Sequence, residues 1–371
     1  MDLKPIFIAA ITAAMLMGLG VHYGTFKPSP LEGSMHLHKI NFPDVTSSTL
    51  GPVRMDDISM HFGLLGPGDP VFNKTIPKHI WTFWTGCIPQ IILSFVANWC
   101  NANPGYQITI MTLENYHEYL DIEDLQAYYS EEFAQRLSDI ARVHAIAKHG
   151  GFWVDSSILM TESLDWAVEL QTKEKAEFIG YYIKADTTTF SSPVIENWFF
   201  GAVPGSRLME DWRREYMRLQ DYQDTQGYLQ HLKERNINLQ RIGSPVYLAQ
   251  HSAMQAVIQN GLANGTKYRF YLMDTYTGPY KFLVERKWNA FVAIKQLPEQ
   301  KELQHRIMKI RGWDRSHIRT TWWHWRALLW FTSIEAQDFF SAFGVNYKAQ
   351  KNMFCNPSPA DNTCTAIQRE I

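Results

Sequence analysis

The sequence has little net charge and few charged residues for its length. Of its 371 residues 19% are charged, and the formal net charge is −2. The strong basic field with which nucleic-acid-binding proteins attract phosphates is therefore missing. Internal repeats and low-complexity tracts are also missing. We therefore expect no nucleic-acid partner. The hydrophobic share of 46% is enough to bury a sizeable core.

Cysteine is scarce. The four cysteines are Cys87, Cys100, Cys355 and Cys364, and their spacing is not that of a zinc site. In an oxidising lumen the local pairs Cys87–Cys100 and Cys355–Cys364 would be one of three connectivities. Buried free thiols are the alternative.

An apolar run stands at the N-terminus. Pro5 to Val21 is an uncharged stretch of 17 residues, at the short limit for a spanning helix. Short spans suit the thinner membranes of the early secretory route. We expect residues 1–27 to form a retained type II signal anchor. A cleaved signal peptide is the alternative, because Gly18-Leu19-Gly20 offers small residues near a cleavage point.

The rest of the chain divides by composition. Residues 28–70 contain recurring prolines with glycine and serine between them, which is typical of a stem. Residues 71–345 form the expected catalytic domain, and residues 346–371 a C-terminal tail. Sequons at Asn73 and Asn264 favour a lumenal domain on a Golgi or other secretory-pathway membrane. A bacterial envelope is the alternative location.

The most informative segment begins with a predicted helix from Glu131 to His149. Its apolar residues recur at spacings of three and four. Asp139 and Arg142 are three residues apart and so share a side of this helix. Gly150 and Gly151 follow a last turn with two basic residues, which is a helix stop signal.

A short predicted strand, Phe152 to Val154, comes next and ends at Asp155. Ligands of open α/β sheets bind beyond the carboxyl ends of strands, so Asp155 is a candidate site residue. A surface ion pair between Asp139 and Arg142 and an N-cap role for Asp155 are the structural alternatives.

These residues carry a resemblance. Ser138-Asp139-x-x-Arg142, the Gly-Gly pair and the two hydrophobic residues before Asp155 resemble the sugar-nucleotide signature of glycosyltransferase family 32. The nearest branch is the capsular-polysaccharide-synthesis type. Segments 76–86 and 195–202 are similar to the family's first strand and to the strand after the signature.

The resemblance implies an α/β, Rossmann-like GT-A fold and transfer of a hexose from a nucleoside diphosphate sugar to a glycan or polysaccharide. Retention of configuration is implied too. Asp139 and Arg142 would contact the donor sugar and diphosphate, and Trp84 would lie at the base, unless it is a core tryptophan. Asp155 would be the first acid of an Asp-x-Asp motif for the ribose and a divalent metal. Arginine and Mg²⁺ or Mn²⁺ can both stabilise a leaving diphosphate.

The chain departs from that motif at Ser157, where the stricter pattern has an acid. Three alternatives follow: Asp155 holds the metal with another residue, binding is water-mediated, or the metal is dispensable. The resemblance also implies that a residue from the C-terminal region completes the metal or diphosphate site. Asp314, Arg315 and His317, in or next to the polar cluster at 309–315, are the candidates. A solvated surface turn is the structural alternative. The expected metal set is Asp155, Ser157 and Asp314.

Two further segments are readable. Residues 202–219 are amphipathic and predict a helix on the sheet. The turn Thr277-Gly278-Pro279-Tyr280 lies where related enzymes place acceptor-side loops. The main alternative function is a sugar- or nucleotide-binding protein without turnover, favoured by Ser157. A glycoside hydrolase is a second alternative, and the donor-type signature opposes it.

Overall fold

A seven-stranded sheet is the centre of the fold. The computed structural model describes residues 58–61, 71, 73–86, 88, 90–128, 135–266, 268–297, 305–316 and 318. The strand order in the large sheet is β1-β8-β6-β7-β4-β2-β3, and β5 pairs with β9 in a small second sheet. The strands are β1 (Ile58–His61), β2 (His79–Phe83), β3 (Gln107–Met111), β4 (Gly151–Val154), β5 (Ile158–Met160), β6 (Phe178–Tyr182), β7 (Ile195–Ala202), β8 (Arg269–Asp274) and β9 (Ile307–Lys309).

Most strands of the large sheet run in one direction. β2 is parallel to β3 and β4, and β6 is parallel to β8. β7 lies between β4 and β6 and is antiparallel to both. The carboxyl ends of β2, β3, β4, β6 and β8 therefore share one edge. That edge is where an open α/β sheet binds ligands.

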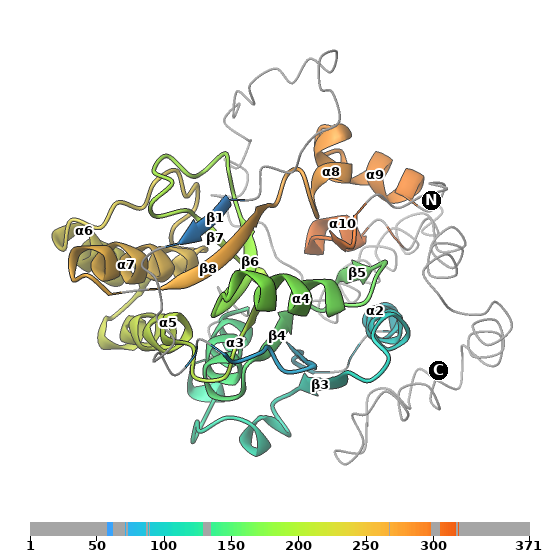
Figure 1. Cartoon of the computed structure of the whole chain (residues 1–371), viewed down its shortest axis with the longest axis horizontal. Coiled ribbons are helices and arrows are strands. Elements are labelled where there is room, and N and C mark those ends of the chain that lie inside the picture. Colours follow the sequence, from blue (N-terminus) through green and yellow to red (C-terminus); the bar gives the residue numbers. More distant parts are fainter. Residues whose placement is uncertain are drawn as a thin grey trace, which may run out of the picture. The chain divides into compact units, whose positions relative to one another are not determined.

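Helices cover both faces of the sheet (Figure 1). One face packs α3, α5 and α7, and the other packs α2, α4 and the β5–β9 ribbon. The helices are α2 (Gln90–Ala102), α3 (Arg136–His149), α4 (Asp165–Glu174), α5 (Arg207–Met217), α6 (Thr225–Glu234), α7 (Ala249–Ala263), α8 (Lys281–Glu285), α9 (Ala290–Gln296) and α10 (Gly312–Ser316), with short 3-10 turns η1 (Tyr116–Glu118), η2 (Gln126–Tyr128) and η3 (Arg218–Asp221).

Two hydrophobic cores result from alternation along the strands. Phe152 and Val154 of β4 enter the core beneath α2 and α4. Trp153, between them, enters the core beneath α3, α5 and α7. This period of two is expected for a strand buried on both faces.

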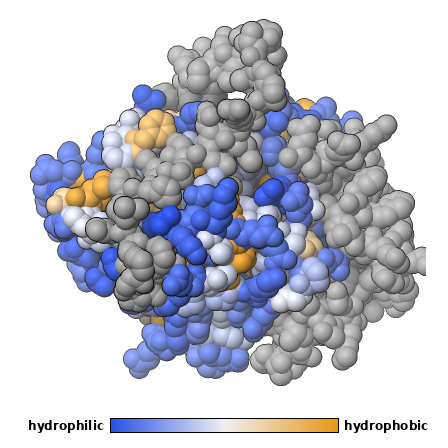
Figure 2. Space-filling view, in the orientation of Figure 1, coloured by the Kyte–Doolittle hydropathy of each residue, from blue (hydrophilic) through white to orange (hydrophobic). Residues whose placement is uncertain are grey.

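The surface that the described residues show in the orientation of Figure 2 is mainly hydrophilic, with a small apolar area over α6 and α7.

The structure confirms most elements expected around the signature. The helix is α3, the strand after it is β4, and the flanking strands are β2 and β7. The helix expected at 202–219 is wrong at its start. Ala202 is the last residue of β7, and α5 begins only at Arg207. A turn at Pro204 and Gly205 separates the two elements, and Ser206 caps α5 by accepting a hydrogen bond from the Met209 amide.

The glycine pair between α3 and β4 makes a turn that larger residues could not make. Gly150 and Gly151 have φ of +68° and +92°, in the region that favours glycine. A Cβ on Gly151 would lie 2.6 Å from the carbonyl oxygen of His79. This close approach holds β4 against β2 and so fixes the position of Asp155.

Several expectations fall outside the described residues. These are the anchor at 1–27, nearly all of the stem, the tail at 346–371, and three cysteines, Cys87, Cys355 and Cys364. Cys100 is buried in α2. Among the helices that the structure describes, none combines the length and apolarity needed to cross a membrane.

Three half-buried histidines should make the stability of the fold sensitive to acid. Burial lowers the pKa values of His79, His144 and His305 to about 4, whereas in the unfolded chain they titrate near 6.5. Between pH 6.5 and 4 the unfolded state binds protons that the folded state does not, so stability rises with pH in this window. Burial raises the pKa of Asp186 to about 6, and it also raises the pKa values of Asp139, Glu177 and Asp274. These four acids oppose the trend of the three histidines.

We expect His144 to raise the thermal unfolding midpoint as the pH increases from 4.5 to 6.5. The midpoint of the variant His144→Gln should therefore rise less over this window, or fall more, than that of the wild type. Scanning calorimetry at several pH values measures the difference. An equal pH dependence in the two proteins would contradict a neutral His144 in the folded state.

Candidate functional site

Helix α3 brings Asp139 and Arg142 together, as their spacing predicted. Nη1 of Arg142 pairs with Oδ1 of Asp139, and both side chains are buried. Burial raises the pKa of the Asp139 carboxyl, and the charge of Arg142 offsets this only in part. The two residues therefore form a buried ion pair, and the structural alternative of a surface ion pair is wrong.

Asp155 meets this unit at the carboxyl end of β4. Its Oδ1 accepts hydrogen bonds from Nη2 of Arg142 and from Nε1 of Trp153, both at 3.0 Å. Its Oδ2 accepts one from Nζ of Lys309 at 2.6 Å. Burial opposes ionisation, but the charges of Lys309 and Arg142 outweigh it and lower the pKa of Asp155. The carboxylate is 27% exposed, so it lies at the surface edge of the cluster.

Gln250 of α7 completes the hydrogen-bond network around Arg142. Its Oε1 accepts hydrogen bonds from Nη1 of Arg142 at 2.6 Å and from Nδ2 of Asn197 at 2.9 Å. Its Nε2 donates to the carbonyl of Asp139 at 2.7 Å. These bonds orient the guanidinium toward Asp155. The sequence analysis missed Gln250, since a single glutamine 108 residues from Arg142 gives no local signal.

The remaining expected site residues take different positions. Trp84 follows β2 and is half-buried, and the guanidinium carbon of Arg315 lies 5.8 Å from its ring centre. Ser157 is buried, and its carbonyl accepts a hydrogen bond from the Ile310 amide at 3.1 Å. Asp314 is fully buried and forms a two-pronged ion pair with Arg311, at 2.8 Å for each oxygen. His317 lies outside the described residues.

The expected metal set does not fit a divalent cation in this arrangement. Magnesium and manganese prefer several oxygen ligands, carboxylates above all. Both oxygens of Asp155 are bonded to cationic side chains, and both oxygens of Asp314 are bonded to Arg311. In the part of the chain that the structure describes, no group of three or more His, Cys, Asp or Glu side chains could hold a metal ion.

The family assignment comes from comparison with known families. A model of the family described as capsular polysaccharide synthesis protein matches residues 69–278, more than half of the chain. The chain belongs to this family. The matched residues include α3, the glycine pair and Asp155 but end before β9. The match confirms the resemblance to capsular-polysaccharide-synthesis-type proteins.

Comparison with solved structures finds glycosyltransferases. The first is the PaToxG glycosyltransferase, at 16% identity and a TM-score of 0.31, covering 51% of this chain and 79% of that one. The ligand-free glycosyltransferase domain of the YGT toxin follows, at 11% identity and 0.31, covering 70% and 97%. The galactosyltransferase LgtC, in complex with donor and acceptor sugar analogues, has 10% identity and 0.34, covering 71% and 99%. Comparison with curated proteins finds no match.

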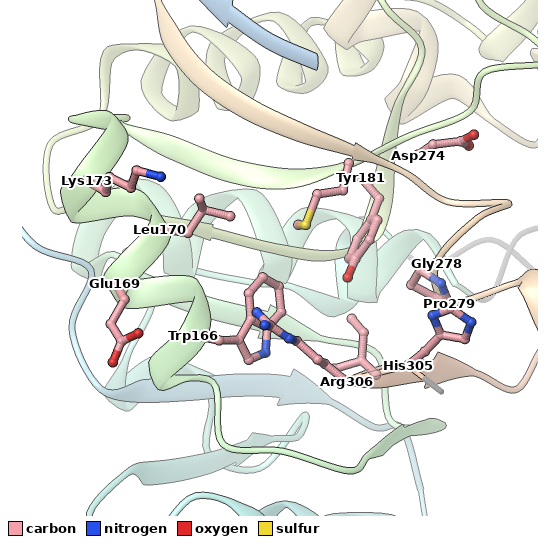
Figure 3. A pocket seen from close by; sticks show the side chains of 12 residues that line it. Trp166, Glu169, Leu170, Lys173, Tyr181, Asp274, Gly278, Pro279, His305 and Arg306 are labelled. Atoms are coloured by element: carbon pink, nitrogen blue, oxygen red, sulfur yellow. The ribbon is translucent and has the colours of Figure 1, made fainter. Parts of the chain in front are cut away.

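A cavity of about 430 Å³ lies between α4, the ends of β6 and β8, and the residues that lead into β9 (Figure 3). Gly278 and Pro279, from the turn expected on the acceptor side, form part of its wall. Tyr181 of this wall stacks on Trp198 at 5.7 Å, and Nζ of Lys309 lies 5.4 Å from the Trp198 ring centre. The ring of Trp198 therefore contacts both the cavity wall and the side chain of Lys309.

Proposed function

We propose that this protein is a GT-A glycosyltransferase that moves a hexose from a nucleoside diphosphate sugar to a hydroxyl of a glycan or polysaccharide. The observation that carries the proposal is the convergence of Arg142 and Asp155, at 3.0 Å, on the ligand-binding edge of the sheet. Membership in the capsular polysaccharide synthesis family supports it. Retention of configuration and a secretory-pathway membrane location remain expectations from the resemblance and the N-terminal apolar run.

The chemistry needs positive charge at the leaving group. The bond between sugar C1 and the β-phosphate oxygen breaks with its electron pair left on the diphosphate. The acceptor oxygen bonds to C1, and its proton passes to the diphosphate or to solvent. A guanidinium in a site shielded from water stabilises the developing phosphate charge. The hydrogen bonds that Arg142 donates to Gln250 and Asp139 hold its guanidinium ready for this role.

One assay tests the proposal. The full chain is incubated with UDP- and GDP-sugars and a polysaccharide acceptor, with Mn²⁺ or with EDTA, and release of nucleoside diphosphate is measured. We expect turnover with at least one donor and its loss in Arg142→Met. Arg214→Met is the matched control, because Arg214 also forms an i,i+3 ion pair, with Asp211 at 3.2 Å, but is 71% exposed. The absence of release with every donor would contradict the proposal.

The alternative is a nucleotide- or sugar-binding protein that does not turn over. Two observations favour it: Ser157 replaces the second acid, and both carboxylate oxygens of Asp155 already accept hydrogen bonds from cationic side chains. The same assay separates the two functions. Saturable binding of UDP or GDP without release from any donor would support the alternative.

Trp84 should contribute to nucleotide affinity. If the base stacks on its ring, Trp84→Ala removes about 1–3 kcal/mol of stacking. We expect the donor KM to rise about tenfold or more, with little change in kcat. Steady-state kinetics measures this split. A fall in kcat at constant KM would instead indicate that Trp84 acts only in the core.

A further inference from the structure

Lys309 is the one residue of the cluster that belongs to the small second sheet. It is the last residue of β9, and the pairing of β9 with β5 places it opposite Ile158, close to Asp155 in the chain. Its side chain is 9% exposed, and its ammonium lies 2.6 Å from Oδ2 of Asp155. Such burial of a lysine is rare unless the charge has a partner. The pairing of β9 with β5 therefore holds the ammonium at the carboxylate, so the contact is not an incidental surface ion pair.

A second cation lies nearby. Arg315 of α10 stands over the ring of Trp84. Burial lowers the pKa of Arg315, and the charges of Asp155 and Asp314 oppose that effect, which means that the guanidinium lies within electrostatic reach of Asp155. Asp314 is already neutralised by Arg311. Asp139 pairs with Arg142, and Asp155 pairs with Arg142 and Lys309, while Arg315 stands over the neighbouring Trp84 ring. Two carboxylates and three cationic side chains leave the cluster with a net positive charge.

This charge pattern is the reverse of a divalent-cation site. A metal at Asp155 would have to displace Lys309 from Oδ2 and bind beside two further cations. Ser157 offers a neutral oxygen in place of the second acid. A nucleoside diphosphate, by contrast, brings the negative charge that the cluster can accept. Lysine binds phosphate as a point charge, and arginine does so with a fork of donors.

We propose that Lys309, with Arg315, supplies the positive charge that a divalent metal supplies in other nucleotide-sugar sites, so that the diphosphate binds and leaves without metal. The inference rests on the proposed function for its role in transfer. As the C1–oxygen bond breaks and its electron pair moves to the diphosphate, the Lys309 ammonium keeps its proton and donates hydrogen bonds to the phosphate oxygens. Asp155 keeps the ammonium in place, and the acceptor's proton passes to the diphosphate.

The test uses inorganic pyrophosphate as the probe and the full chain as the protein. Isothermal titration calorimetry gives the Kd in EDTA and in Mn²⁺. We expect the two values for the wild type to agree within about threefold. In Lys309→Met the Kd in EDTA should rise about tenfold or more, as expected for loss of one charge-assisted hydrogen bond, and Lys309→Arg should restore most of it. Lys148→Met is the matched control, because Lys148 forms an exposed pair with Asp121 at 2.7 Å, and it should bind as the wild type does.

Each outcome decides the inference. Pyrophosphate binding that requires Mn²⁺, or equal binding by Lys309→Met and wild type, overturns it. The EDTA measurement on the wild type decides it even if Lys309→Met does not fold. The nucleotide-release assay distinguishes failure of this inference from failure of the proposed function. Turnover only with Mn²⁺ would support the transferase but overturn the proposed role of Lys309. Metal-free pyrophosphate binding without turnover of any donor would keep Lys309 as a phosphate ligand and refute transfer.

Discussion

Replacing Gly151 with alanine should destabilise the protein by about 3 kcal/mol or more, although it adds only one methyl group. The added Cβ would meet the His79 carbonyl oxygen at 2.6 Å, at a φ of +92°. Backbone strain and overpacking each cost about 1–3 kcal/mol, and a backbone carbonyl cannot move aside as a side chain can. Urea unfolding measures the loss.

Gly105 provides the matched control. It has a φ of +84°, but a Cβ there would have no atom within 4 Å. Gly105→Ala should therefore lower the free energy of unfolding only through backbone strain at positive φ, by about 1–2 kcal/mol. Equal losses in the two variants would show that the close approach of β4 to β2 does not matter for stability.

Asp155→Asn should abolish most of the activity. The asparagine keeps the size of the side chain but removes the charge that holds Lys309 and Arg142. Loss of a preorganised electrostatic contact lowers kcat by about 10²–10³-fold. The free energy of unfolding should fall by about 1–3 kcal/mol, because two buried cations lose their counter-charge while the carboxylate itself is partly exposed. The nucleotide-release assay and urea unfolding measure the two effects.

Asp165→Asn controls for loss of a paired carboxylate. Asp165 also accepts two bonds, from Nζ of Lys78 at 2.8 Å and from the hydroxyl of Tyr106 at 2.9 Å, but it is 46% exposed and lies on α4. We expect unchanged turnover and a stability loss under about 1 kcal/mol. Wild-type turnover in Asp155→Asn would remove Asp155 from the site.

The sequence predicted the local geometry of the candidate site well. Helical spacing placed Asp139 beside Arg142, and the glycine stop and apolar triplet placed Asp155 at the end of a strand. Both features depend only on neighbours in the chain. The structure adds what no local pattern contains: Nη2 of Arg142 reaches Asp155 across 13 residues, and Lys309 reaches it across 154.

The later part of the chain holds a contact that the sequence could not predict. The cluster at 309–315 drew attention to Asp314, which the structure pairs with Arg311, whereas Lys309 is the residue that meets Asp155. Three-residue strands such as β9 have too few residues to show a period. The pairing of β9 with β5 was therefore invisible, and with it the contribution of Lys309.

The pairing of β5 with β9 has a practical meaning for anyone who shortens this protein. A fragment trimmed to the matched segment at 69–278 would still contain β2 to β8, so it could form nearly all of the large sheet and keep Asp139, Arg142 and Asp155. It would lack both Lys309 and Arg315. Of the cluster it would keep two carboxylates, Asp139 and Asp155, and one cation, Arg142. We therefore expect such a truncated protein to repel the anionic ligand that we propose for the intact chain.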